Sequence, residues 1–154
     1  MNLIEGMLVE SGARDGGDAG TLCVSFTGAS VPLPPSVADG ARGAGPDVVL
    51  GVRPESLHLS ADGPITATVI IVEILGAETH VICHTETGAR LIVRQGAQER
   101  RPAIGETVHI AVDPAPGAFH LFDATTGARL GDGAGAVNAA SASAAPSVSV
   151  GTTP

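Results

Sequence analysis

Short runs of β-branched and other apolar residues, separated by turn-forming residues, recur through the first 130 residues of the chain. In the stretch GTLCVSF, Leu22, Val24 and Phe26 alternate with Cys23 and Ser25, which is the two-residue period of a strand. Clusters of Gly, Asp and Pro between the runs predict turns. The spacing predicts an all-β domain, a small barrel or sandwich of short antiparallel strands. The predicted strands are Ile4–Glu10, Thr21–Phe26, Val31–Leu33, Val48–Arg53, Ile65–Leu75, His80–Thr85, Leu91–Arg94, Thr107–Val112 and Phe119–Phe122.

Three stretches depart from simple alternation. Pro34–Ala41 predicts at most a short helical piece. In Ile65–Leu75 the first half alternates, but Ile70, Ile71 and Val72 are apolar on both faces, which predicts that another layer or subunit covers the second face. After Leu130 the residues are small and almost uncharged, which is typical of disorder. We therefore divide the chain into a domain of residues 1–130 and a disordered tail of residues 131–154.

Charged or polar residues follow several of the apolar runs. The clearest case is Arg53-Pro54-Glu55, which interrupts the stretch VVLGVRPESLHLS at a proline that cannot donate a ladder hydrogen bond. Charged or polar residues also end apolar runs at Leu75–Thr79, at Arg94-Gln95-Gly96 and at His120–Asp123. Such charges protect strand ends from edge-to-edge pairing, or they form a surface that docks onto another domain. The pattern alone favours edge protection.

The charge of the chain excludes several classes of function. The 154 residues carry a net charge of −8, and all eight basic residues are arginine. An acidic chain repels nucleic acid and anionic membrane surfaces, and the aromatic content of 2% leaves no platform for stacking bases. A P-loop needs a lysine to hold the nucleotide phosphates. Because this sequence has no lysine, it contains no P-loop.

Residues that carry catalysis or hold metals are sparse. Cys23 and Cys83 lie in apolar runs, which favours buried free thiols over a disulfide. His80 and His84 have the spacing of a metal-ligand pair only on a helix, and their neighbours predict a strand. No serine elbow or other nucleophile–base arrangement is recognisable, so we predict a chain that is not an enzyme. No leader peptide or membrane span is recognisable either, which predicts a cytoplasmic protein.

Several stretches, in order, resemble one family. LGVRPESLHL resembles the Leu-Gly-Val-Arg-Pro-Glu segment, and VEILGAETHV the Glu-x-x-Gly-x-Glu turn, of the C-terminal domain in ATP-binding subunits of maltose-type sugar ABC importers. Met1-Asn2-Leu3 resembles the start of that domain, and LIVRQG with IGETVHIAVDPAPGAFHLFDATTGARL resembles its closing strands. Ser56 departs from the histidine usual in the family, and the Walker A, signature and Walker B motifs have no counterpart here. The chain thus matches only the accessory domain, as a fragment, a truncated gene product or a free-standing relative.

The resemblance implies a TOBE domain, the transport-associated relative of the oligonucleotide-binding fold. It implies a non-catalytic regulatory and dimerisation role in an importer of maltose, trehalose, glycerol phosphate or a related solute. The expected partners are the nucleotide-binding domain, a second copy of the domain and a regulatory protein, at the cytoplasmic face of the membrane. No cofactor is expected, since ATP and Mg²⁺ would bind only the nucleotide-binding domain. The expected interface residues are Arg53, Pro54, Glu55, Glu73, Gly76, Glu78 and Arg94.

A second hypothesis comes from another class of protein. Related folds bind oxyanions such as molybdate through backbone N–H groups and a few polar side chains. A free-standing module that binds a small oxyanion is therefore the alternative to the importer domain.

Overall fold

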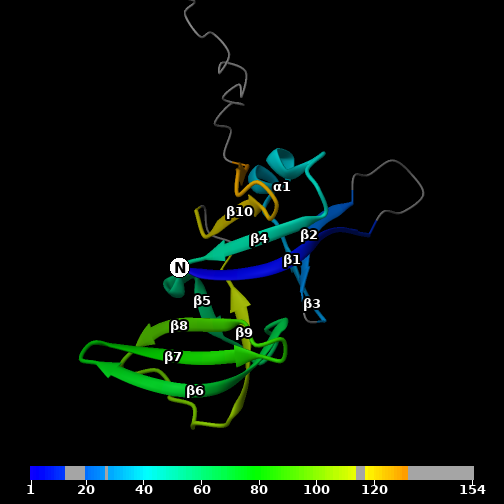
Figure 1. The fold of residues 1–154 in the computed structure, drawn as a ribbon. Helices are drawn as coiled ribbons and strands as arrows, with labels where there is room; N and C mark the ends of the chain where they lie inside the picture. Colours follow the sequence, from blue (N-terminus) through cyan, green and yellow to red (C-terminus); the bar gives the residue numbers. More distant parts are fainter. Residues whose placement is uncertain (13–19, 27, 114–116, 132–154) are drawn as a thin grey trace, which may run out of the picture.

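The computed structural model describes residues 1–12, 20–26, 28–113 and 117–131. The elements are β1 (Asn2–Ser11), β2 (Thr21–Phe26), β3 (Ala29–Pro32), α1 (Pro35–Ala41), β4 (Asp47–Val52), the 3₁₀ turn η1 (Pro54–Ser56), β5 (Leu57–Leu59), β6 (Ile65–Leu75), β7 (Glu78–Thr85), β8 (Arg90–Gly96), β9 (Thr107–Val112), β10 (Phe119–Asp123) and β11 (Arg129–Leu130). They form two antiparallel sheets, in the orders β11-β10-β4-β1-β2-β3 and β5-β9-β6-β7-β8. In Figure 1 the first sheet, capped by α1, lies above the second.

The prediction of an all-β domain of short antiparallel strands is confirmed. The nine predicted strands and the short helix are all present, while β5 and β11 were not predicted. The expected strand Val31–Leu33 begins and ends earlier, at Ala29–Pro32, because its register is set by pairing with β2. The predicted disordered tail falls on residues 132–154, outside the described residues, apart from Gly131.

One continuous core joins the two sheets. Alternate residues of each strand point inward, so Ile4, Val24 and Leu50 of the first sheet meet Val81 and Ile110 of the second in one cluster. These side chains are aliphatic and almost completely buried. Burying a side chain of this kind contributes about 1.5–3 kcal/mol, so the shared core is what holds the sheets together. Cys23 and Cys83 are free and buried, as predicted.

The corner Arg53-Pro54-Glu55 carries the chain from one sheet to the other. β4 ends in the first sheet at Val52, η1 turns the backbone, and β5 begins in the second sheet. Pro54 stands at the first position of η1, where its missing N–H is not needed, and the Ser56 N–H donates to the Arg53 carbonyl over 3.0 Å. The turn therefore has a structural cause besides the two considered from sequence: it is the crossing between the sheets.

Asn2 forms a second link between the sheets, between β1 and the edge strand β8. Its side chain is only 3% exposed. Its Nδ2 donates to the Ile92 carbonyl over 3.0 Å, and its Oδ1 accepts the Ile92 N–H over 2.7 Å. A single amide thus satisfies both backbone groups of an edge residue, which would otherwise be open to pairing.

The β6–β7 hairpin forms an arm that projects beyond the neighbouring strands (Figure 1). The pairing of β6 with β7 shifts register between Val69 and Ile71, which is the mark of a β-bulge. At and beyond this point Val72 packs partly against the core, while the other apolar residues of β6 stay exposed: Ile70, Ile71, Ile74 and Leu75. No described part of the chain covers them, so the covering layer expected from sequence would have to be another polypeptide.

The Asn2 link predicts a measurable loss of stability on substitution. Asn2→Ala leaves the partly buried N–H and C=O of Ile92 without this partner, and a buried group of this kind costs about 1–3 kcal/mol. We expect the free energy of unfolding in urea to fall by about that amount. The control Ser30→Ala, at an exposed strand position, should change it by less than about 0.5 kcal/mol. Equal effects of the two changes would contradict the role given to Asn2.

Candidate functional site

The seven residues predicted as an interface fall into two groups. Arg53, Pro54 and Glu55 form the corner between β4 and β5. Glu73, Gly76, Glu78 and Arg94 lie on the arm and on the adjoining strand β8. Their contact with another polypeptide stays a prediction, but the two groups define two surfaces with different chemistry.

We name the surface at the corner the corner hollow. It has a volume of about 520 Å³ and is lined by Met1, Arg53, Pro54, Glu55, His120, Phe122 and Arg129. The β10–β11 pairing brings His120 and Arg129 together, and Arg129 Nη2 lies 2.8 Å from His120 Nδ1. Arg53 and Glu55 form no ion pair with each other or with any other described residue.

The arm combines exposed apolar residues with charge. Ile71, Glu73 and Leu75 share one face of β6 by alternation, and Glu73 stands opposite His80 on β7. Arg94 Nη2 and Glu78 Oε1 form an ion pair of 2.6 Å, which fixes two of the predicted interface residues to each other. Gly76 has a φ of +74° in the two-residue turn of the arm, where a side chain would be strained.

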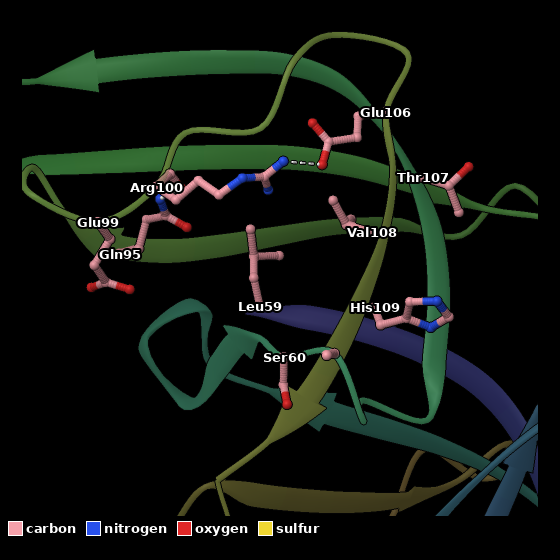
Figure 2. Close-up of a pocket in the computed structure, with 10 residues that line it drawn as sticks. Leu59, Ser60, Gln95, Glu99, Arg100, Glu106, Thr107, Val108 and His109 are labelled. Atoms are coloured by element: carbon pink, nitrogen blue, oxygen red, sulfur yellow. Dashed lines mark hydrogen bonds and ion pairs between the residues drawn. The ribbon is translucent and has the colours of Figure 1, made fainter.

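Another hollow, of about 340 Å³, lies under the loop between β8 and β9 (Figure 2), and we name it the loop hollow. Leu59 and Val108 form apolar walls, and the loop is closed above them by an ion pair of 2.6 Å between Arg100 and Glu106. Gln95 Nε2 donates to the Arg100 carbonyl over 2.7 Å. The charged groups of the loop hollow thus bind to one another and hold the loop in place. The loop hollow therefore has fewer charged groups available to bind a ligand than the corner hollow has.

Hydrogen bonds lower the pKa of two partly exposed carboxylates. The Arg100 guanidinium is the main cause of the lowered pKa of Glu106, and the Ala103 N–H adds to it. The Thr126 N–H and hydroxyl lower the pKa of Asp123, which closes the turn between β10 and β11. Burial raises the pKa of the Cys83 thiol to about 11, so this residue is unreactive as a nucleophile near neutral pH.

Four members of these surfaces were not among the interface residues predicted from sequence. His120 and Arg129 join the corner hollow through strand pairing, which local pattern does not reveal. Arg100 and Glu106 pair across a loop, with no periodicity to mark them. His80 and His84 both lie on β7, as the strand prediction requires. Of the helices that the structure describes, none has the length and apolar character needed to cross a membrane.

Two protein families match this chain. The MalK OB fold domain family matches residues 1–57, and the TOBE domain family matches residues 50–120. The two matches overlap at residues 50–57, which is where the corner crosses from one sheet to the other.

Curated relatives are ATP-binding proteins of importers. The sn-glycerol-3-phosphate import ATP-binding protein UgpC of Salmonella typhi is 36% identical over 136 residues, covering 84% of this chain and 33% of that protein. UgpC of Cereibacter sphaeroides is 40% identical over 91 residues, covering 56% of this chain and 25% of that protein. The chain therefore spans about a third or less of the length of these relatives.

A solved structure with a similar fold is the cytoplasmic molybdate-binding protein ModG. The TM-score is 0.55 at 18% sequence identity, over 78% of this chain and 94% of that one. At this identity the likeness concerns the fold alone.

The Arg100–Glu106 pair predicts a specific pH dependence of stability. Because the folded state lowers the pKa of Glu106 below its ordinary 4.5, its contribution is present above pH 4.5 and is lost as pH falls through the folded-state pKa. Glu106→Gln should therefore lower stability at pH 7 and flatten the decline below pH 4.5, as measured by urea unfolding. The control Glu86→Gln, an exposed carboxylate in a turn, should keep the wild-type profile. An unchanged acid profile in Glu106→Gln would contradict this assignment.

Proposed function

The chain belongs to the TOBE and MalK OB fold domains of the kind carried by ABC importer ATP-binding subunits, and from this membership we propose that it is a non-catalytic regulatory and dimerisation domain of such a subunit. The observation that carries the proposal is the ordered match of residues 1–120 to the two families. The names of the relatives favour sn-glycerol 3-phosphate as the transported solute. The working place of the domain would be the cytoplasmic face of the membrane, beside the nucleotide-binding domain.

The chemistry of the described residues supports a role without catalysis. The sequence contains no lysine for nucleotide phosphates. The Cys83 thiol is buried with a raised pKa, and the charged pairs hold turns and strands of the domain itself. A domain of this kind acts by contacts, and its surfaces are where its function would lie.

We assign the dimer contact to the arm. Ile74 and Leu75 are 59% and 56% exposed near the tip of the hairpin, and they lie on opposite faces of β6. Exposed apolar residues on both faces of a projecting hairpin gain stability when a second polypeptide covers them. Glu73 forms no ion pair with a described residue, so a basic group of the second copy would pair with it and set register more than affinity.

The dimer contact can be tested with two leucines of equal exposure. Leu75 on the arm and Leu3 on β1 are both 56% exposed. We expect Leu75→Asp to weaken self-association of the full chain by about tenfold or more, because it places an unpaired charge in an apolar contact. Sedimentation equilibrium over a concentration series measures it. A monomeric wild-type chain, or the same loss in Leu3→Asp, would contradict the assignment.

The importer role can be tested in a relative. We expect a Salmonella typhi UgpC whose matching segment is replaced by this chain to support uptake of sn-glycerol 3-phosphate, while the same subunit without that segment does not. The isolated chain should neither bind nor hydrolyse ATP, as measured by calorimetry and phosphate release, because no lysine is present to hold the phosphates. ATP turnover by the isolated chain, or a chimera without uptake although ATP is hydrolysed, would contradict the proposal.

A further inference from the structure

The corner hollow gathers positive charge on an acidic protein. The sequence has 16 acidic residues against eight basic ones. Elsewhere on the described surface Arg42, Arg94 and Arg100 pair with carboxylates, and Arg101 donates to the Ala97 carbonyl. Arg90 forms no ion pair with a described residue. Arg53 and Arg129 both line the corner hollow, and Arg53 forms no ion pair with a described residue.

Besides the two arginines, the His120 ring supplies a third hydrogen-bond donor to the corner hollow. A guanidinium can only donate, so in its 2.8 Å contact with Arg129 the His120 Nδ1 accepts. In that arrangement the ring proton lies on Nε2. The lining of the corner hollow therefore offers two guanidinium groups and an imidazole N–H as donors, and these come from the corner, from β10 and from β11.

The remaining lining residues suit a short organic group. Met1 and Phe122 offer apolar surface, and the Glu55 carboxylate accepts hydrogen bonds from hydroxyl groups. A volume of about 520 Å³ is in the range of small-molecule sites and too small for a folded domain. Arginines that reach an ion from separate elements match a phosphoryl group, whose three terminal oxygens accept from several directions.

From these observations we infer that the corner hollow, lined by Arg53, His120, Arg129 and Glu55, binds a phosphate monoester of a small polyol or sugar. The arginines and His120 hold the phosphoryl oxygens, while Glu55, Met1 and Phe122 contact the hydroxylated carbon chain. This goes beyond the proposed function, since the binding itself needs no importer. Only the consequence, that such a ligand would regulate transport, rests on that function.

The test is calorimetry on the full 154-residue chain with three probes: sn-glycerol 3-phosphate, inorganic phosphate and glycerol. We expect saturable binding of sn-glycerol 3-phosphate, weaker binding of inorganic phosphate and no binding of glycerol. Arg53→Gln and Arg129→Gln should each weaken binding of the ester by about tenfold or more, because each removes charge-assisted hydrogen bonds. The matched control Arg90→Gln, at an exposed position of β8 outside the corner hollow, should keep the wild-type affinity.

Three results would overturn the inference. They are the absence of ester binding up to about 10 mM, an affinity that Arg53→Gln leaves unchanged, and an equal affinity for inorganic phosphate, which would remove recognition of the organic group. Because Arg129→Gln also breaks the contact with His120, urea unfolding checks its fold, and Arg53→Gln tests the site independently. A chain that binds the ester but stays monomeric would support this inference and contradict the dimer assignment.

Discussion

The side-chain amide of Asn2 holds an edge strand of one sheet against a central strand of the other. A side-chain amide can both donate, through its NH2 group, and accept, through its oxygen, so it satisfies the C=O and N–H of Ile92 much as a neighbouring strand would. Ile92 belongs to β8, which pairs with β7, and β7 forms the arm with β6. Two hydrogen bonds at Asn2 thus tie β1 to the strands that carry the exposed arm. The buried core supplies most of the stability, but this pair decides where β8 lies along β1.

The corner depends on the same arrangement of two sheets. A chain that leaves β4 in one sheet and enters β5 in the other must turn within a few residues, and Pro54 limits the backbone to such a turn. Neither sheet face can bury the charged neighbours, so Arg53 and Glu55 remain at the surface. The sequence suggested two explanations of this stretch, edge protection and docking. Both take the charged side chains to be the reason for the interruption of the apolar run. The structure gives the crossing as the primary cause, and the charged side chains are what it leaves available for binding.

The sequence predicted the elements well and their assembly poorly, for a physical reason. Alternation of apolar residues is local, so strands such as β2 and β7 were visible from their own residues. β5 and β11 span three and two residues, too few for a period to show. The division of strands between two sheets is non-local, and nothing near Val52 indicates that the next strand joins another sheet.

The same distinction governs the candidate sites. Ile4 points into the core, and Asn2 has the same parity on β1, so a buried polar residue there was predictable from sequence. Its partner, 90 residues away, was not. Arg53, Pro54 and Glu55 stood out as an interruption of an apolar run, while His120 and Arg129 joined them only because β10 pairs with β4 and β11.

The acidity of the whole chain affects which anions could bind at Arg53. Carboxylates outnumber arginines two to one, yet Arg53 forms no ion pair with a described residue. Glu55 is close in sequence, but Arg53 is extended before Pro54 while Glu55 lies inside the 3₁₀ turn, and the two do not pair. Charge is screened over about 8 Å in physiological salt. A small phosphate ester within the hollow would therefore meet mainly its arginines, whereas a long polyanion would also meet the surrounding negative surface. The acidity that argues against nucleic acid thus makes the hollow selective for small anions.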